Sequence, residues 1–293
     1  MTQVNLEAVA FVLGGYTPLP TVAGASSAGF DAPVTCAQSI NTSEPSQMNA
    51  AAALAVATPE RNVRAPGPMP SPPESVPNLD LDVLRQHMTV VRRKLTPGQY
   101  LYRAGQPFHA LYLVHAGFLK SRIQTVDGRE QITGFHLRGE LLAVDSIGTA
   151  THACDVIALD FSEVWELPYP PVLHACMRVP ELQARLTAAL SAEIRRDHNW
   201  MLALGTLDAE QRVALFLLDL AQRYRAMGFS PSHFVLRTTR AEMGSFLALK
   251  HETVTRALSH LGTLGYIEVE RREVRIRDAD ALARLAGGSV RLQ

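Results

Sequence analysis

Three polar side chains near the C-terminus are spaced so that one face of a short helix would carry them all. Glu252, Thr255 and Arg256 share a face if a helix begins near Lys250. In the major groove of DNA, an arginine can bond guanine O6 and N7, and a carboxylate can accept from cytosine N4. Glu252 can also brace Arg256 through a charge-assisted hydrogen bond. The spacing predicts base reading, with an ordinary exposed ion pair as the alternative.

Two predicted helices position this face. Residues 238–247 and 251–258 are amphipathic and flank a three-residue break at 248–250, and an alternating hairpin follows at 267–277. The inner face of the second helix would hold Val254, Leu258 and Leu261. This arrangement is typical of a helix-turn-helix. The predicted DNA-contacting residues are Thr239, Arg240, Lys250, His251, Glu252, Thr255 and Arg256, with the hairpin arginines on phosphates.

Composition limits the class of protein. The 293 residues have a formal net charge of zero, so contact with double-stranded DNA must come from a local surface. The three cysteines Cys36, Cys154 and Cys176 have no paired spacing, which argues against a secreted disulfide framework. No apolar run approaches the length of about 18 residues that a membrane span needs. We expect a cytoplasmic protein that does not enter a membrane.

Composition and periodicity divide the chain into four predicted parts. Residues 1–77 hold 11 of the 18 prolines and no lysine, and are expected to form a disordered arm and linker, or a dispensable extension. Residues 78–177 show short β-rich runs broken by glycines, which favours a β-barrel. Residues 178–206 predict one long helix, and residues 207–293 contain the helix-turn-helix.

The long predicted helix carries a stripe typical of a dimer seam. Its apolar residues recur at steps of three, four and seven, as in a coiled coil. The predicted dimer-interface residues are Leu186, Leu190, Ile194, Asp197 and Met201. Two copies of Asp197 facing each other would weaken association, because like charges repel across an apolar seam. The alternative is that the stripe packs on its own β-barrel.

The stretch from about residue 100 to residue 284 resembles the Crp/Fnr family of bacterial transcription regulators, and its Fnr branch in particular. The resemblance is carried by Gly134-Phe135-His136-Leu137, Glu193-Ile194, Gly228-Phe229-Ser230-Pro231 and Glu252-Thr253-Val254-Thr255-Arg256. It implies an α+β fold: a cyclic-nucleotide-binding-like double-stranded β-helix, a long dimerisation helix and a winged helix-turn-helix. It also implies a homodimer that binds a palindrome of TTGAT-like half-sites and recruits or blocks RNA polymerase.

The predicted helix-turn-helix departs from the family in three places. In the family, the residues that match Glu252 and Arg256 read a G·C pair. The Fnr branch usually has Ser where this chain has Thr255, whose added methyl suits a thymine methyl. His251 replaces a small apolar residue, which leaves the outermost base open. Ala248 stands where members usually have Gly, and a positive φ there would cost about 1 kcal/mol.

The resemblance also bears on cofactors. Members that bind cAMP have an Arg-Ser pair where this chain has Thr151-His152-Ala153, so cAMP is not expected. Oxygen-sensing Fnr proteins hold a [4Fe–4S] cluster on three N-terminal cysteines and one barrel cysteine, whose place Trp165 takes here. Cys36, Cys154 and Cys176 form no metal ligand set, so an iron–sulfur cluster is not expected. A weak phosphate site at His152 and a thiol-redox role for Cys36 stay open as alternatives.

Together these patterns predict a sequence-specific transcription regulator. No His, Cys or carboxylate set has metal or nucleophile spacing, and no phosphate-cradling glycine loop occurs, which argues against an enzyme. The alternative from another class is a small-molecule or thiol-redox receptor of the same fold, whose main output is protein binding.

Overall fold

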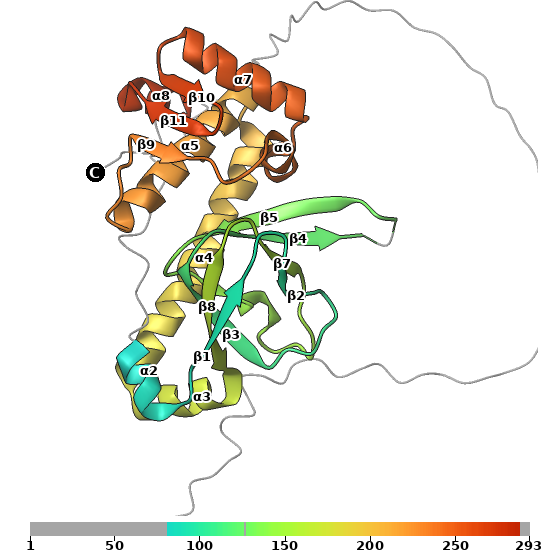
Figure 1. Ribbon diagram of the computed structural model, residues 1–293, viewed down its shortest axis with the longest axis vertical. Helices are drawn as coiled ribbons and strands as arrows, with labels where there is room; N and C mark the ends of the chain where they lie inside the picture. The colour runs from blue at the N-terminus through green and yellow to red at the C-terminus, as the bar shows by residue number, and fades with distance from the viewer. Residues whose placement is uncertain (1–80, 126, 288–293) are drawn as a thin grey trace, which may run out of the picture. The chain divides into compact units, whose positions relative to one another are not determined.

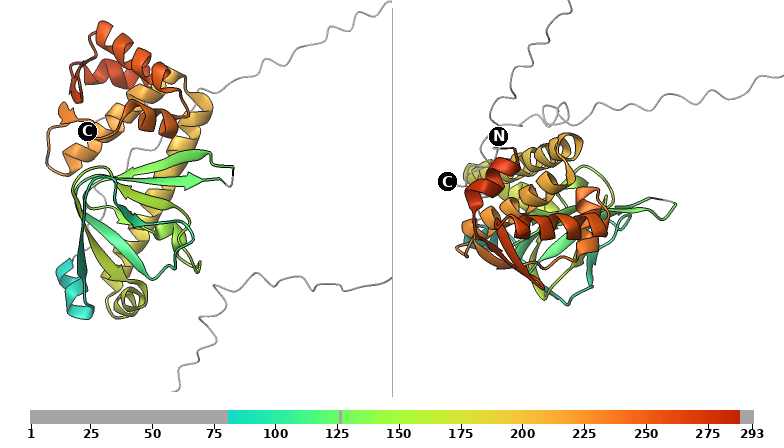
Figure 2. Two further views of the ribbon diagram at one scale, coloured as in Figure 1. Left: turned by 45° about the vertical axis from the view of Figure 1, so that its right-hand side comes forward. Right: turned by 90° about the horizontal axis from the view of Figure 1, so that it is seen from above.

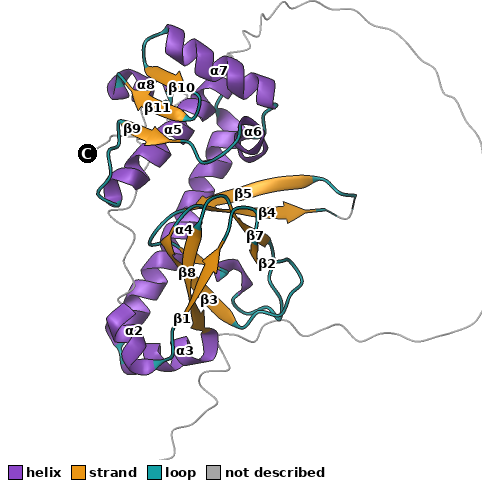
Figure 3. Cartoon of the chain, in the orientation of Figure 1, coloured by secondary structure: helices purple, strands orange, loops and turns teal. Residues whose placement is uncertain are grey.

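The computed structural model describes residues 81–125 and 127–287, so the predicted arm at 1–77 lies outside the described residues. Short strands rich in apolar residues form two four-stranded antiparallel sheets, ordered β1-β8-β3-β6 and β2-β7-β4-β5 (Figures 1 and 3). The strands are β1 (Val91–Leu95), β2 (Tyr100–Tyr102), β3 (Ala110–Ala116), β4 (Leu119–Gln124), β5 (Glu130–His136), β6 (Leu141–Leu142), β7 (Asp155–Ala158) and β8 (Ser162–Pro168), with a short 3₁₀ helix η1 (Val144–Ser146) after β6.

The two sheets enclose the core of the predicted β-barrel. Tyr112 and Val164 of the first sheet and Leu119 and Val156 of the second are each at most 1% exposed and belong to one cluster. Strand β3 is buried over five consecutive residues, because it packs on the other sheet and also on the helices. The glycine-punctuated β-rich runs therefore form a barrel, as predicted.

Three helices flank the barrel: α2 (Leu81–His87), α3 (Tyr169–Arg178) and α4 (Pro180–Thr206). Helix α3 was not predicted separately, because it lies in the segment 78–177 assigned to the barrel. Prolines in its first turn start α3, and Val179 has extended backbone with φ of −128°. Pro180 disfavours the helical conformation at Val179, so α3 ends there and α4 begins in a new direction.

The predicted seam on α4 divides into two parts. Leu186 is 8% exposed and packs with Leu182 against α2, α3 and the barrel. Ile194 and Met201, further along, are 56% and 69% exposed. For the first part of the stripe the structure favours the alternative of packing on the protein's own barrel, because Leu186 belongs to the protein's own core. Only the later part of α4 offers apolar side chains to a partner.

The C-terminal domain comprises the elements from α5 to α8. They are α5 (Ala209–Ala226), β9 (His233–Val235), α6 (Arg240–Leu247), α7 (His251–Thr263), β10 (Ile267–Glu270), β11 (Glu273–Ile276) and α8 (Ala279–Leu285). The strands form an antiparallel sheet ordered β10-β11-β9, which is the predicted hairpin with one further strand. Val213, Phe216 and Leu217 of α5 are at most 1% exposed and anchor this domain's core.

The turn between α6 and α7 has the left-handed backbone that the sequence suggested. Ala248 has φ of 53° and ψ of 43°, and the N–H of Leu249 donates to the carbonyl of Gly244 at 2.8 Å. A Cβ at Gly244 would lie 2.6 Å from the carbonyl oxygen of Leu249, so that close approach requires glycine. Ala248 has no such freedom, and its Cβ strains the turn.

The barrel, α4 and α5 meet around a buried cluster of charged residues. The Glu140 carboxylate, between β5 and β6, accepts from Arg223 Nη2 at 2.8 Å and lies 3.2 Å from Arg196 Nη1. Burial alone would raise the pKa of Glu140, but the two guanidinium groups lower it to about 2. His136 lies against Glu140, with Nδ1 at 3.8 Å from the carboxylate, and its Nε2 is 3.0 Å from Ser121 Oγ. Glu193 lies beside Arg196. We call Glu140, His136, Arg196, Arg223 and Glu193 the junction cluster.

Burial at the junction cluster predicts that acid destabilises the protein. Burial lowers the pKa of His136 to about 4, from an unfolded value near 6.5. Between these pH values the unfolded chain binds a proton that the folded chain does not, so stability falls as pH falls, by roughly 1.4 kcal/mol per pH unit. Urea denaturation at pH 7.5 and 5.5 should show this loss, reduced by about 1 kcal/mol in His136→Gln. His174→Gln, at an exposed histidine, is the control and should lose as much stability as wild type. A loss in His136→Gln equal to that of wild type would contradict this account.

The strained turn gives a second stability prediction. Ala248→Gly removes the left-handed Cβ clash, and the added freedom of glycine in the unfolded chain offsets part of this gain. The variant should be more stable by up to about 1 kcal/mol, seen as a higher Tm. Ala184→Gly, at an exposed position inside α4, should lower Tm. A lower Tm for both variants would show that the turn is not strained.

Candidate nucleic-acid interface

A capping box fixes the start of α6. The N–H of Glu242 donates to Thr239 Oγ1 at 3.1 Å, and the N–H of Thr239 donates to Glu242 Oε2 at 2.7 Å. These bonds satisfy two backbone donors that a helix start leaves open. Thr239, a predicted DNA contact, therefore has a structural role in capping. Glu242 was not among the predicted residues, although a Thr followed three residues later by a Glu is the sequence signature of this motif.

Helix α7 separates its apolar and polar residues as predicted. Val254, Leu258 and Leu261 are at most 4% exposed and pack into the C-terminal domain. The opposite side exposes His251, Glu252, Thr255 and Arg256, which we call the reading face. Lys250 precedes the helix at its N-cap and is also exposed. The structure therefore brings four of the predicted contacts onto one open surface at the start of a helix.

The interactions within the reading face differ from the predicted brace between Glu252 and Arg256. Glu252 instead lies 3.3 Å from His251 Nε2, and Arg256 Nη2 is 3.5 Å from Thr253 Oγ1. The Thr255 hydroxyl donates to the carbonyl of His251 at 2.9 Å. Both charged side chains are exposed, and pairs of this kind contribute little to stability. Arg256 and Glu252 can therefore move to base edges at small cost.

The remaining predicted contacts lie beside the hairpin of β10 and β11. Arg240 is half-buried, and its Nη2 donates to the carbonyl of Arg271 at 3.5 Å. Arg275 and Arg277 both lie near Glu268, and Arg277 donates to it from Nε at 3.1 Å. Arg271 and Arg272 form the exposed hairpin turn. Glu268 partly neutralises Arg275 and Arg277, so the hairpin turn is the better candidate for contact with the phosphate backbone of DNA.

Aromatic rings pack around His152, at the place where cAMP-binding members of the family have an Arg-Ser pair. His152 is 3% exposed and stacks on Tyr102, with ring centroids 3.8 Å apart. Phe108 lies edge-on to the same imidazole at 5.6 Å. Burial lowers the pKa of His152, which favours the neutral ring. A neutral, stacked histidine is a weak partner for a phosphate, so the structure gives the alternative site at His152 no support.

Trp165, at the place of the family's cluster-binding cysteine in the barrel, stacks on a neighbouring ring. Trp165 lies 4.2 Å from the ring of His115, with an interplanar angle of 20°, and the guanidinium of Arg85 is 5.5 Å from its ring centroid. Cys154 and Cys176 are buried in two different apolar clusters, and burial raises the pKa of both thiols. Both therefore stay protonated at neutral pH. Cys36 lies outside the described residues.

Family models match both halves of this arrangement. Residues 92–178 match the cyclic nucleotide-binding domain, and residues 211–285 match the Crp-like helix-turn-helix domain. None of the described helices is both long and apolar enough to span a bilayer.

Curated relatives cover most of the chain. The transcriptional regulatory protein Btr of Bordetella pertussis is 38% identical over 220 residues, which is 75% of this chain and 88% of that protein. The transcriptional activator protein Anr of Pseudomonas aeruginosa is 39% identical over 68% of this chain and 81% of its own length. The fumarate and nitrate reduction regulatory protein of Escherichia coli is 37% identical over 70% of this chain and 82% of its own length.

Solved structures share the fold. FixK2 from Bradyrhizobium japonicum is 28% identical, with a TM-score of 0.62 over 68% of this chain and 98% of that one. A CRP/FNR-family regulator from Thermus thermophilus is 20% identical, with a TM-score of 0.55 over 67% of this chain and 98% of that one. With the two domain matches, these relatives show that the chain belongs to the Crp/Fnr family of DNA-binding transcription regulators, which are not enzymes, and that its likeness is to the Fnr branch.

Proposed function

We propose that the protein acts as a homodimer that reads a palindrome of TTGAT-like half-sites in the major groove. The observation that carries this proposal is the division of α7 into a buried apolar side and an exposed reading face. Arg256 would bond guanine, Glu252 would accept from the paired cytosine, and Thr255 and His251 would contact the neighbouring bases. Lys250, Arg240 and the hairpin turn would hold the phosphate backbone.

The later part of α4 supports the proposed dimer. Ile194, Met201 and Leu202 are between 47% and 69% exposed, although large apolar side chains are normally buried. Met201 and Leu202 also line a surface hollow together with His198, Gly205 and Thr206. A second copy of α4 would cover these side chains. It would also place two reading faces on one DNA molecule, as a palindrome requires.

We propose that the dimer works in the cytoplasm with RNA polymerase as its partner, without cAMP and without an iron–sulfur cluster. The name of the relative Anr describes that protein as a transcriptional activator, which supports the polymerase as partner. The stacked positions of His152 and Trp165 support independence from the two cofactors. The receptor alternative through thiol redox chemistry finds no accessible thiol among the described residues, because both cysteines there are buried.

Arg256→Ala tests base reading. The variant should lose about 1–3 kcal/mol of binding free energy on TTGAT-N4-ATCAA, and much of the preference for guanine at the contacted position. Fluorescence anisotropy measures both quantities. The salt concentration is about 0.15 M, because phosphate contacts are then partly screened. Arg272→Ala, in the hairpin turn, is the control and should weaken all duplexes alike. An equal loss by Arg256→Ala on a scrambled duplex would assign Arg256 to phosphate instead.

Asp197→Ala tests the seam. Partial burial, together with the nearby Glu193 carboxylate, raises the pKa of Asp197. Removing it should strengthen dimerisation roughly tenfold, because two facing charges no longer repel. Ile194→Asp should have the opposite effect. Analytical ultracentrifugation measures both, and unchanged sedimentation of Asp197→Ala would remove Asp197 from the interface.

A further inference from the structure

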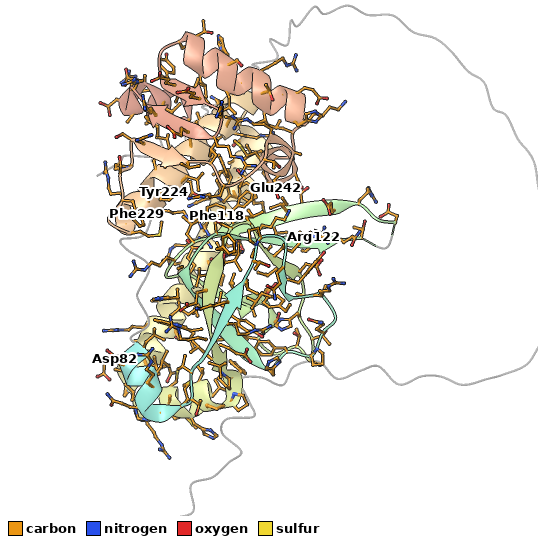
Figure 4. All side chains as sticks on the ribbon, viewed as in Figure 1. Asp82, Phe118, Arg122, Tyr224, Phe229 and Glu242 are labelled. Atoms are coloured by element: carbon orange, nitrogen blue, oxygen red, sulfur yellow. The ribbon has the colours of Figure 1, made fainter. Side chains whose placement is uncertain are left out.

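The hairpin formed by β4 and β5 reaches the first helix of the helix-turn-helix. Lys120 Nζ of β4 lies 2.6 Å from Glu242 Oε1 of α6, and both side chains are less than one fifth exposed. The backbone N–H of Ile132 in β5 donates to Ser245 Oγ at 3.0 Å, and the Gln131 side chain donates to the Ser245 carbonyl. The hairpin lies below α6 in both side views (Figures 1 and 2), and Glu242 is labelled at this boundary in Figure 4.

Aromatic packing continues the same contact toward the long helix. Phe246 of α6 is 8% exposed, and its ring centroid is 5.3 Å from that of Phe135 in β5. On the other side, Trp200 of α4 meets Phe246 edge-on at 4.7 Å. Edge-to-face pairs of this kind contribute beyond the apolar area they bury. Helix α6 is therefore held by the barrel and by α4 at once.

Glu242 connects this contact to the recognition machinery, because the same carboxylate binds Lys120 and caps α6. Burial would raise the pKa of Glu242, but the hydrogen bonds from Lys120 and from the N–H of Thr239 lower it overall. The carboxylate is therefore charged at neutral pH, and it neutralises a lysine at a helix N-terminus, where a cation is otherwise unfavourable. Without Lys120, Glu242 would keep its cap but lose its partner in the barrel.

The contact leaves the DNA-binding surface open. All four residues of the reading face remain exposed while α6 is bound to the hairpin. The hairpin therefore fixes the position of α6 without covering α7. Since α6 and α7 are joined by a tight turn, fixing the first helix also fixes the angle of the second.

We propose that Lys120 and Gln131 are positioning residues for DNA recognition, and that the β4–β5 hairpin braces the helix-turn-helix at the angle that two half-sites require. The proposal rests on the proposed reading of DNA by α7. A dimer contacts both half-sites only if both reading faces are held correctly, so a loose α6 costs ordering entropy when the palindrome is bound. A duplex with one intact half-site is contacted by one reading face, so its binding does not require both faces to be held at a fixed angle.

The test compares Lys120→Met, Lys120→Arg and Gln131→Ala in the full chain. Lys94→Met, at an exposed lysine of β1, controls for the loss of one positive charge. Each variant is titrated onto TTGAT-N4-ATCAA and onto a duplex with one half-site scrambled. Lys120→Met and Gln131→Ala should bind the palindrome roughly tenfold more weakly and the single half-site within about twofold of wild type. Lys120→Arg and Lys94→Met should bind both duplexes as wild type does.

Tryptophan emission gives a readout that does not depend on DNA. The chain has two tryptophans, so Trp165→Phe leaves Trp200, which packs on Phe246, as the only reporter. In that background Lys120→Met and Gln131→Ala should shift the emission to longer wavelength, because a looser α6 exposes the indole, while Lys94→Met should not. Gln131 is exposed, so its variant tests the brace even if Lys120→Met fails to fold.

Several results would overturn the brace. These are unchanged palindrome binding with unshifted emission, an equal loss on both duplexes, or tighter palindrome binding by Lys120→Met, which would make the contact inhibitory. A wild-type protein with no preference for the palindrome would overturn the proposed function and the brace with it. That outcome is distinguishable, because it is seen before any variant is compared.

Discussion

The carboxylate of Glu140 is a buried charge, and together with its two arginine partners it joins three parts of the chain. Arg223 belongs to α5, Arg196 belongs to α4, and Glu140 itself follows the barrel strand β5. Removing such a charge from water costs several kcal/mol, which only close and well-oriented partners offset. The barrel, the long helix and the C-terminal domain must therefore meet in one arrangement, because any other would leave at least one of these charges without its partners.

This constraint joins the dimer helix to the DNA-binding domain. Arg196 precedes Asp197 of the proposed seam, and Arg223 lies on the helix that supports α6 and α7. The contact of the β4–β5 hairpin with α6 adds a second point of attachment close to the reading face. Two attachments restrict rotation of the C-terminal domain where one would allow it. A regulator that must present two reading faces at a fixed spacing benefits from that rigidity.

The predictions that were confirmed concern short-range patterns. The β-rich runs form the barrel, and the periodicity of Val254, Leu258 and Leu261 places the reading face outward, because helix and strand periods are local properties. The departures concern where an element ends and which partner a side chain contacts. Helix α3 ends before the proline at 180, Leu186 is buried by α2 and α3, and Glu252 pairs with His251 rather than with Arg256. Which of several nearby partners a side chain contacts depends on its rotamer, and sequence spacing does not specify the rotamer.

The sequence by itself determined the helix-turn-helix, the barrel and the apolar stripe, because residue periodicity decides which side of an element is buried. The resemblance to the family also marked the strained turn at Ala248, since members usually have glycine at this left-handed position. Only the tertiary structure decided that Glu140 binds Arg223, that Lys120 binds Glu242 across 122 positions, and that the seam on α4 is exposed only in its later part. Those choices depend on which distant surfaces meet, and charged residues far apart in a chain carry no periodic signal of their partners.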